Sequence, residues 1–545
     1  MKPFRRRTTG EPRYLVYRHA LPVRAMHWVN FLCLLVLLMS GLQIFNAHPA
    51  LYWGQSSHFT GSSFFGTPIL SIRSTRGPAG TLTGITRIGD AEFDTTGWLG
   101  ASPGPDGHLR PRAFPPWSTL PGVRWLAMGR HWHFFFAWVL VINAFLFFLY
   151  SLVSGHLRED LLPRRRELRG IGRSLLSHLK LRFPRGEEAE RYNPLQKLAY
   201  LSVIFGLGPL VVLTGLTMSP YMDSVAPWLL WLFHGRQSAR TIHFVCAFSF
   251  LGFFVVHMLM VLLSGALNNL RSMITGWYGI DTDAPREQRR ELPASQRRAF
   301  LGWAAVGAGS LLLAGCDRLS RTARVPRVLR SAETLTRDAQ HLLGSPLGLA
   351  PTYSKADIDP VFRANGTTDP ADPGYQALAR AGFRDWRLRI HGLVEHPLAL
   401  TLADLRRLPS QTQITRHDCV EGWSCIGQWT GVRLQVLLDR VSPTHRARYV
   451  VFHCADTMAG SGDRYYESLD LREAYHPQTL LAYALNGHTL PVAHGAPVRL
   501  RAERMLGYKM AKYVMRIELV ESLAGIAGGH GGYWEDRGYA WYAGI

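Results

Sequence analysis

Four histidines lie in or at the ends of long apolar stretches: His27, His133, His243 and His257. An ionisable side chain inside a membrane helix is costly, so its presence there indicates a function. Neutral imidazole is an axial ligand of haem iron, and two imidazoles on one iron give an electron-transfer centre. His243 and His257 are 14 residues apart. On one helix that spacing returns to nearly the same face, about 21 Å along the axis, as two stacked haems would require.

The apolar stretches are long enough to cross a bilayer, which takes about 20 residues. They cover residues 28–47, 132–154, 197–218 and 241–265, and a shorter apolar run covers 299–315. Segment 134–140, FFFAWVL, is apolar on every side, unlike a helix on the surface of a soluble protein. We therefore predict a membrane all-α four-helix haem bundle plus a fifth transmembrane helix.

Positive charge is unevenly divided between the connecting segments. Residues 156–195 carry 10 Lys and Arg, whereas the longer segment 48–124 carries 6. Segments dense in Lys and Arg stay in the cytoplasm. This rule places 48–124 in the periplasm and lets the fifth span carry the C-terminal residues out to the same side. His27 then lies level with His257, and His133 level with His243, so each pair would bind one haem.

Two ligand assignments stay open. His131 could replace His133, and His19 could replace His27, although His19 precedes Pro22 and lies outside the predicted helix.

The six cysteines include no CxxC pair, which argues against a zinc site, a disulfide framework or covalent haem attachment. Cys425 and Cys454 could form a disulfide in an oxidising compartment or stay reduced.

The net charge is +22, from 61 Lys and Arg against 39 Asp and Glu. Such a basic chain could bind nucleic acid. Much of the charge instead clusters beside the apolar spans, where it sets topology, so we expect no nucleic-acid partner.

Three runs around the histidines resemble the di-haem cytochrome b subunits of formate dehydrogenases, NiFe-hydrogenases and thiosulfate reductases. They are RAMHW at 24–28, WHFFFAW at 132–138 and SARTIH at 238–243. The resemblance covers about residues 15–275. It implies a haem bundle with two b haems that exchanges electrons with a quinone.

A second set of runs lies near the C-terminus, in the order FRANG (362–366), HDCVEGWS (417–424), HGAPVR (494–499), GYKMAK (507–512) and YWEDRGY (533–539). This ordered set resembles the sulfite-oxidase-type molybdopterin domain, a soluble α+β fold. A cysteine thiolate is the soft ligand that molybdenum needs beside its dithiolene sulfurs. The resemblance implies that Cys419 binds molybdenum.

The same resemblance implies roles for other residues. Those assigned to catalysis are Cys419, Tyr539, Asn365 and Arg363. Those assigned to the pterin cofactor and its phosphate are His417, His494, Arg499, Lys509 and Lys512. Because the phosphate is anionic, Arg499, Lys509 and Lys512 offer charge-assisted donors.

Sulfite oxidases bind their dianion with several arginines, and the candidates here are Arg363, Arg416, Arg464 and Arg504. The run CVEGWS is closer to the catalytic subunit of bacterial methionine-sulfoxide reductases. That resemblance favours a reductase.

The run SQRRAFL at 295–301 resembles a twin-arginine export signal, which would export a folded, cofactor-loaded domain. LAGC at 313–316 resembles a lipoprotein cleavage box. We expect no cleavage there, because cutting would separate the two parts of the chain.

Five local patterns predict elements in the soluble part. Alternation predicts a strand at 387–390, and Thr401 caps a helical pattern. Residues 434–438 read as a helix, and 498–500 and 514–519 as strands.

We therefore expect three regions. Residues 1–280 form a di-haem cytochrome b membrane domain with the periplasmic loop 48–124. Residues 281–349 form a twin-arginine-like anchor helix and linker, and 350–545 a molybdopterin-binding oxidoreductase domain.

The predicted function is oxygen-atom transfer at a molybdenum centre on the periplasmic side of a bacterial inner membrane, coupled to the quinone pool. The partners would be quinone, membrane lipid and a small oxygen-atom donor, an S- or N-oxide. One alternative is a sulfite-type dehydrogenase that feeds electrons to quinone. Another is an electron-transfer cytochrome with a non-catalytic docking domain.

Overall fold

The computed structural model describes residues 6–8, 13–60, 66–77, 80–104, 106–163, 167, 169, 171–172, 193–281, 317–322, 324–458 and 461–545. The chain divides into two compact units, each assembled from separate stretches. The first comprises Met1–Gly41, Trp132–Leu213 and Ile242–Arg321, and the second comprises Leu42–His131, Thr214–Thr241 and Thr322–Ile545.

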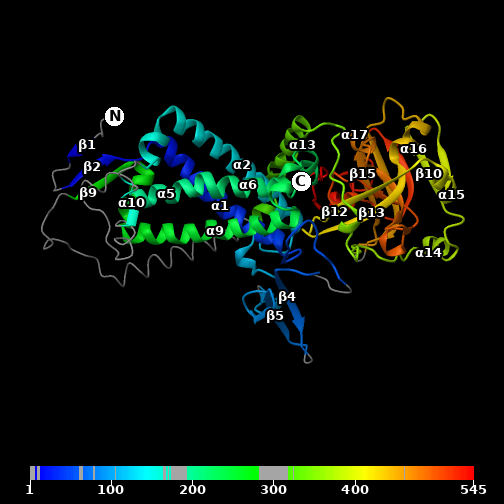
Figure 1. The fold of residues 1–545 in the computed structure, drawn as a ribbon, viewed down its shortest axis with the longest axis horizontal. Helices are drawn as coiled ribbons and strands as arrows, with labels where there is room; N and C mark the ends of the chain where they lie inside the picture. The colour runs from blue at the N-terminus through cyan, green and yellow to red at the C-terminus, as the bar shows by residue number, and fades with distance from the viewer. Residues whose placement is uncertain are drawn as a thin grey trace. The chain divides into compact units, whose positions relative to one another are not determined.

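Four long apolar helices make up most of the first unit (Figure 1). They are α1 (Leu21–Phe45), α2 (Leu126–Val153), the span Pro194–Leu216 and α9 (Arg236–Leu263). The third combines α5 (Pro194–Ser202), the π-helical η4 (Val203–Leu207) and α6 (Gly208–Leu216). Each is long and apolar enough to cross a membrane, which confirms the four predicted spans.

Each helix begins several residues before its predicted span. The first turns are polar, as in residues 236–240 of α9, so a criterion based on apolar runs misses them. The predicted fifth span, 299–315, lies outside the described residues, as do Arg297, Arg298 and Cys316.

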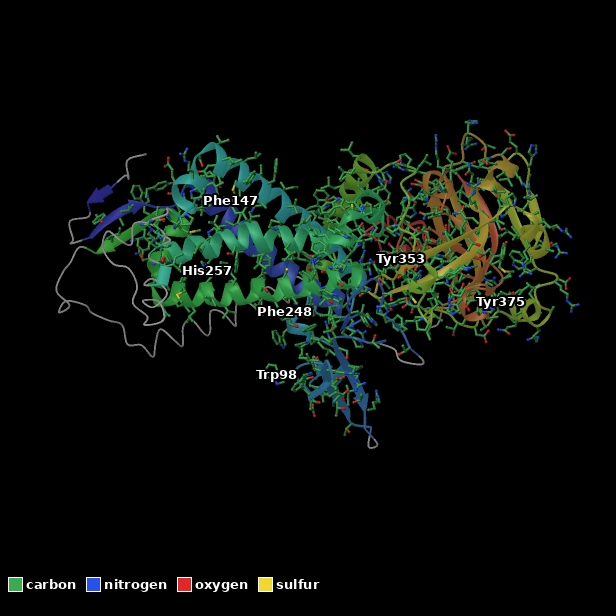
Figure 2. The ribbon with its side chains drawn as sticks, viewed as in Figure 1. Trp98, Phe147, Phe248, His257, Tyr353 and Tyr375 are labelled. Carbon is green, nitrogen blue, oxygen red and sulfur yellow. The ribbon has the colours of Figure 1, made fainter. Side chains whose placement is uncertain are left out.

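Polar and aromatic contacts hold the helices of the first unit side by side. The side-chain amide of Asn143 on α2 donates to the carbonyl of Met26 (3.0 Å) and to the side chain of Asn30 (2.7 Å) on α1. Elsewhere the helices expose large apolar side chains, such as Phe248, labelled in Figure 2. Such surface is what a helix bundle presents to lipid.

Smaller elements complete the first unit. A three-stranded sheet has the order β1-β2-β9, so the N-terminal segment pairs with the residues that follow α10. The elements are β1 (Arg6–Thr8), β2 (Arg13–Tyr17), η2 (Leu157–Leu161), α10 (Ala266–Thr275) and β9 (Trp277–Asp281).

Segment 48–124 belongs to the second unit and is not the irregular loop that its lack of periodicity suggested. Most of its strands are only two to four residues long and rich in polar residues, so they carry little hydrophobic alternation. Gly89, with φ +57°, and Asp90 form the two-residue turn between β5 and β6. Trp98, labelled in Figure 2, is 72% exposed here. The elements are β3 (Ala50–Leu51), β4 (Leu70–Arg76), β5 (Leu82–Ile88), β6 (Ala91–Asp94), β7 (Ala101–Pro103), β8 (Leu109–Pro111) and η1 (Pro116–Ser118).

The described part of the predicted anchor and linker region, 281–349, contains two helices, α12 (Arg324–Leu329) and α13 (Ser331–Leu343). On α13, Gln340 donates to Ser219 (3.0 Å) and accepts from Tyr542 (2.7 Å). Ser219 caps α7 (Pro220–Val225), which precedes α8 (Trp228–Leu232). The linker is thus packed against the rest of the second unit.

Two five-stranded sheets form the main body of the second unit. One has the order β11-β10-β19-β14-β15, and the other is β12-β13-β16-β17 with β18 paired to β16. In the first sheet β10 runs parallel to β19 and the other pairs are antiparallel. The strands are β10 (Arg387–Gly392), β11 (Leu398–Thr401), β12 (Ser410–Asp418), β13 (Ser424–Arg433), β14 (Tyr449–Thr457), β15 (Arg464–Asp470), β16 (Leu480–Leu485), β17 (His488–Thr489), β18 (Arg499–Arg501) and β19 (Val514–Val520).

The predicted strands at 387–390, 498–500 and 514–519 are therefore confirmed to within a few residues. The predicted helices also form. Thr401 accepts a hydrogen bond from the amide of Asp404, whose carboxylate caps Thr401 in return. The helices and short turns of this body are η6 (Lys355–Asp357), α14 (Pro373–Arg380), α15 (Leu402–Arg407), α16 (Leu434–Val441), α17 (Leu471–Ala474), η7 (Val492–His494), η8 (Gly507–Lys509) and η9 (Glu535–Arg537).

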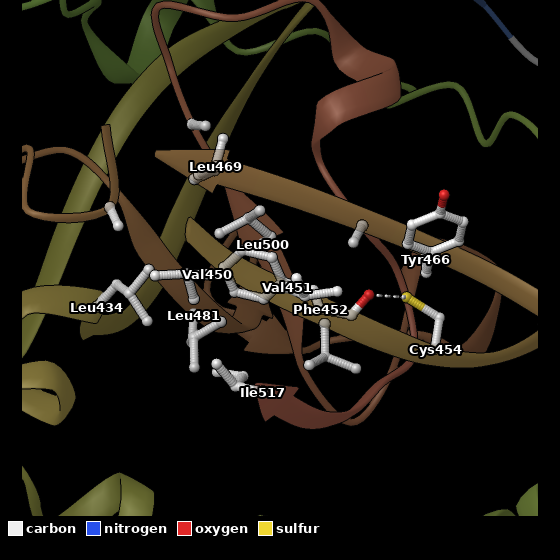
Figure 3. Packing of buried hydrophobic residues seen from close by; sticks show 14 of the residues in the cluster. Leu434, Val450, Val451, Phe452, Cys454, Tyr466, Leu469, Leu481, Leu500 and Ile517 are labelled. Atoms are coloured by element: carbon white, nitrogen blue, oxygen red, sulfur yellow. Dashed lines mark hydrogen bonds between the residues drawn. The ribbon is translucent and has the colours of Figure 1, made fainter. Parts of the chain in front are cut away.

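A large apolar core joins the two sheets. Figure 3 shows Val450, Val451 and Phe452 of β14 packed with Leu481 of β16 and Ile517 of β19. All five are almost completely buried. The core fixes the strands whose ends carry the candidate site.

Cys425 and Cys454 are both buried free thiols, so the predicted disulfide alternative does not form. Cys454 points its thiol at the carbonyl of Phe452 (Figure 3), and Cys425 points at the carbonyl of Val361.

Candidate functional site

Cys419 occupies a tight turn between β12 and β13. Asp418 pairs with Ser424 across the strands, the amide of Cys419 donates to the carbonyl of Trp423 (3.0 Å), and Gly422 donates back to Cys419 (2.9 Å). Gly422 has φ +108°, a conformation that side chains rarely adopt. The turn therefore holds the Cys419 thiol at one defined place, in the wall of a cavity.

The thiol packs in an apolar cluster and also has polar neighbours. The amide of Asn365 lies 3.6 Å from Cys419 Sγ. The guanidinium of Arg363 stacks 4.9 Å from the ring centre of Trp423, whose indole donates to Glu421 (2.9 Å). Burial and the Glu421 carboxylate raise the pKa of Cys419, so the thiol keeps its proton until a cation lowers that pKa.

The cavity is cationic at the residues predicted to bind the cofactor. His494, Arg499 and Lys512 line it together with His417. Burial, with help from Arg499, lowers the pKa of His494 to about 4 and that of Lys512 to about 7. These groups repel one another when charged, so the cavity is suited to an anion.

His417 lines the same cavity, and its ring is held between Arg501 and Gly507. Its Nδ1 accepts from Arg501 (2.9 Å), which leaves Nε2 as the protonated nitrogen. Burial and Arg501 lower the pKa of His417 well below its usual value. A Cβ on Gly507 would lie 2.4 Å from this ring, so the close approach requires glycine.

Lys509 is not in the cavity. Its ammonium is buried between the carboxylates of Glu467 (2.5 Å) and Glu535 (2.6 Å). Burial disfavours the charged ammonium, but the two carboxylates outweigh that effect and raise the pKa of Lys509. Lys509 is thus engaged in a triad that ties β15 to the loop 507–512 and to the segment 533–539. Lys512, unlike Lys509, lines the cavity, and its ammonium donates to the carbonyls of Asn365 (2.8 Å), Thr367 and Ala493 (3.1 Å).

Tyr539 lines the cavity together with Trp534 and Tyr508. Its ring makes an edge contact with Tyr508 at 5.4 Å between centroids. Burial raises the pKa of Tyr539, so its phenol is a proton-bearing donor at neutral pH.

Of the four arginines considered for an anionic substrate, only Arg363 lines the cavity. Arg416 and Arg504 are buried in ion pairs with Asp418 and Glu473. Arg464 pairs with Asp372 at the surface.

A buried charge network behind Cys419 was missed in the sequence. Arg416 bonds to Asp418 (2.8 Å) and to Asp223 of α7 (2.5 Å), and Arg236 donates to Ser424 (2.9 Å). Burial alone would raise the pKa of Asp418, but Arg236 and Arg416 outweigh it and lower that pKa. The network anchors both strands that flank the Cys419 turn. Its members are far apart in sequence, so no local motif could reveal it.

Asp456 is a second residue that the sequence did not suggest. It lines the cavity, and burial raises its pKa to about 6. Asp456 lies near the end of β14, a strand that is buried along most of its length, and belongs to no recognisable motif.

The four predicted haem ligands form two pairs in the first unit. The ring centroids of His27 and His257 are 6.3 Å apart, and those of His133 and His243 are 6.2 Å apart. Two metal–nitrogen bonds of about 2 Å each, plus the distance from ring nitrogen to ring centre, add up to such a separation. Each pair therefore fits one iron between its imidazoles.

Ser40 was not predicted, yet it orients one of these rings. Its hydroxyl lies 3.1 Å from Nδ1 of His133 and donates to the carbonyl of Val36 (2.7 Å). Fixing Nδ1 in this way directs the other nitrogen toward a metal. The open alternative His131 instead bonds the carbonyl of Gly538 (2.8 Å) in the second unit.

The cavity around Cys419 fits the molybdopterin cofactor. It combines a soft thiol ligand with cationic side chains, and Arg499 Nε is buried there without a hydrogen-bond partner among the described residues. An anionic phosphate would satisfy such a group. Within the described part of the chain no cluster of three or more His, Cys, Asp or Glu side chains forms a conventional metal site.

Comparisons with known proteins assign the two parts of the chain separately. The family described as prokaryotic cytochrome b561 matches residues 18–276, and the oxidoreductase molybdopterin binding domain matches residues 376–524. A putative protein-methionine-sulfoxide reductase subunit, YedZ1 of Azospira oryzae, is 36% identical over 274 residues, covering 50% of this chain and 97% of the relative. The chain belongs to both families.

Relatives that match the oxidoreductase domain are also named as methionine-sulfoxide reductase subunits. The protein-methionine-sulfoxide reductase catalytic subunit MsrP of Ralstonia nicotianae is 34% identical over 241 residues, which cover 42% of this chain and 69% of that protein. MsrP of Xanthomonas campestris is 39% identical over 165 residues, covering 29% of this chain and 51% of its own. The chain spans about half the length of this second relative.

The chain is thus a molybdopterin-dependent oxidoreductase with a cytochrome b-type domain in one polypeptide. The family assignment confirms the two predicted resemblances. The individual site residues remain predictions supported by their placement in the structure.

Proposed function

We propose that this protein is a membrane-bound sulfoxide reductase that takes electrons from a quinol, passes them through two b haems and delivers them to a molybdenum centre on Cys419. The observation that carries the proposal is the cavity itself. It places Cys419 beside the neutral donors Asn365 and Tyr539 and only one candidate arginine, Arg363. A neutral sulfoxide oxygen needs hydrogen-bond donors, whereas a sulfite dianion needs several cations.

The names of the relatives support the same substrate class. Both MsrP and the YedZ1 subunit are named for methionine-sulfoxide reduction. A resemblance of domain does not by itself fix a substrate, so the assignment to this chain is a proposal that rests on both the names and the cavity.

The reaction converts a sulfoxide, two electrons and two protons into a thioether and water. Molybdenum would supply the two-electron oxygen-atom acceptor, with Cys419 as its protein ligand. Arg363, Asn365 and Tyr539 would bind and orient the sulfoxide oxygen. His417, His494, Arg499 and Lys512 would hold the pterin and its phosphate.

Electrons would arrive one at a time through the histidine pairs. His27 and His257 would hold one haem, and His133 and His243 the other. The charge of the connecting segments supports a periplasmic oxidoreductase domain, with the His133 and His243 haem on that same side of the inner membrane. Joining both domains in one chain keeps donor and acceptor at high effective concentration, so no soluble carrier is needed.

The test uses the haems as their own indicator. The purified, molybdenum-loaded chain is reduced with a quinol analogue, and methionine sulfoxide, dimethyl sulfoxide or trimethylamine N-oxide is then added. Reoxidation of the haems by a sulfoxide is the expected result. In a second series sulfite is added to the oxidised protein, and haem reduction there would identify the sulfite-type dehydrogenase instead. A haem spectrum that responds to neither series would leave only the non-catalytic docking role.

A further inference from the structure

Among the lining residues of the cavity in the second unit, one comes from the stretch matched by the cytochrome b561 family. Leu126, at the start of α2, lines the cavity together with Cys419, Val420, Trp534 and Tyr539. It lies within residues 18–276, the stretch matched by the cytochrome b561 family. An oxidoreductase domain on its own would lack this side chain.

The next turn of α2 holds the segment that carries Tyr539. Arg130 donates to the carbonyl of Ile545 (2.6 Å), and His131 donates to the carbonyl of Gly538 (2.8 Å). The positive charge of Arg130 also acts on the phenol of Tyr539, where it opposes the effect of burial. Leu126 and Arg130 are four residues apart and therefore lie on one face of the helix.

The cavity is lined by side chains of chemically different kinds. His494, Arg499 and Lys512 make part of the lining cationic, and an anionic phosphate would lie against it. Leu126, Val420, Trp534 and Tyr539 add apolar surface to a lining that also contains the polar side chains of Arg363 and Asn365. A sulfoxide has a polar S=O group and two apolar substituents, so this apolar surface suits its carbon side.

We propose that the first two turns of α2 complete the active site: Leu126 is a specificity-determining residue that contacts a substituent of the sulfoxide, and Arg130 and His131 are positioning residues for the Tyr539 segment. This inference rests on the proposed function. It assigns to the cytochrome-type part of the chain a direct role in selecting the substrate.

The test is a competition between dimethyl sulfoxide and methyl phenyl sulfoxide. The full chain is supplied with electrons by a reduced viologen dye, and the ratio of the two thioether products is measured. Because both substrates compete for one enzyme, the ratio does not depend on the rate of electron supply. Leu126→Ala should raise the share of methyl phenyl sulfide, and Leu126→Phe should lower it, each by on the order of tenfold.

Leu146→Ala is the matched control, because Leu146 lies on the same helix but is exposed on the bundle. Its product ratio and the haem spectra of all variants should equal those of the parent chain. If the parent reduces both sulfoxides and neither Leu126 variant moves the ratio by more than twofold, the inference is overturned while the proposed function stands. If the parent reduces neither of these sulfoxides nor methionine sulfoxide, both are overturned.

His131 gives an independent measurement. His131→Phe removes the donor to Gly538 and should lower kcat with the dye by about tenfold, the worth of one well-placed hydrogen bond. His131→Gln keeps an N–H donor and should recover most of that loss. Equal kcat in the two variants would contradict the positioning role. Should His131→Phe fail to fold, the Leu126 variants decide the question.

Discussion

Single residues explain why the cavity is suited to a metal. The thiol of Cys419 is buried, and burial with Glu421 raises its pKa, so it does not behave as an exposed reactive cysteine. The turn that holds it is closed by backbone hydrogen bonds and by Gly422. The side chain therefore has little freedom other than to point into the cavity.

Replacing Cys419 by Ser should abolish sulfoxide reduction and leave the haem spectrum unchanged, because the haem ligands belong to other elements. Turnover and the visible spectrum are measured on the same preparation. Cys454→Ser is the matched control, since Cys454 is buried in the core and does not line the cavity. Turnover in Cys419→Ser at the rate of this control would refute the thiolate ligand.

Asp223 should make stability depend on pH. Burial raises the pKa of Asp223 to about 7, well above its unfolded value of 3.8. Between these two pH values the folded chain keeps a proton that the unfolded chain releases, so the free energy of unfolding falls as pH rises. The slope from this group is at most about 1.4 kcal/mol per pH unit.

Asp223→Asn should flatten that dependence between about pH 4 and 7, measured as the thermal unfolding midpoint in detergent. The exposed Asp90, substituted in the same way, should leave it unchanged. An identical pH dependence in parent and Asp223→Asn would show that this carboxyl ionises normally.

At the scale of elements, α9 is the structural link between the two predicted haems. It supplies His243 and His257 to partners on two different helices, α2 and α1. The spacing along one helix fixes the separation of the two centres.

His257→Ala should therefore remove about one haem of two and retain the other, and the His243→Ala, His257→Ala double variant should lose both. Haem content per protein is measured by pyridine haemochrome absorbance. His156→Ala serves as control, because His156 pairs with Asp160 and faces no second histidine ring among the described contacts. Full haem content in the double variant would invalidate both assignments.

Local patterns predicted elements well wherever one face is apolar or a cap is present. The Thr401 cap and the strand at 387–390 depend on neighbours a few residues away, which the sequence shows directly. The strands between 48 and 124 were missed because most of them are only two to four residues long and rich in polar residues. The ion pairs of Arg416 and Lys509 depend on partners 193 and 42 residues away, so charge alone suggested ligand binding where the structure has internal pairing.

At the scale of the whole molecule, one polypeptide joins a cytochrome b561-type part to an oxidoreductase domain. The second unit includes residues from both matched regions. Removing the segments 42–131 and 214–241 would therefore leave the oxidoreductase body without Leu126, Arg236 and the whole of α7.

The predicted topology can be checked in living cells. A phosphatase reporter that is active only in the periplasm should be active when fused after Ile545 and inactive when fused after Gly276. The reason is that the Lys- and Arg-rich segments stay in the cytoplasm. A fluorescent reporter that fails to mature in the periplasm should give the opposite pattern. Phosphatase activity at both positions would contradict the assigned number of crossings.

The triad of Lys509, Glu467 and Glu535 has a consequence for how this family can diverge. One ammonium faces two buried carboxyl groups, and burial with Glu535 already raises the pKa of Glu467, so a substitution that removes the cation alone would leave two carboxyl groups in the protein interior that cannot both ionise. A lineage can lose Lys509 only if a carboxylate changes with it. The three positions should therefore covary among homologues as one inherited unit, although 68 residues separate the first from the last.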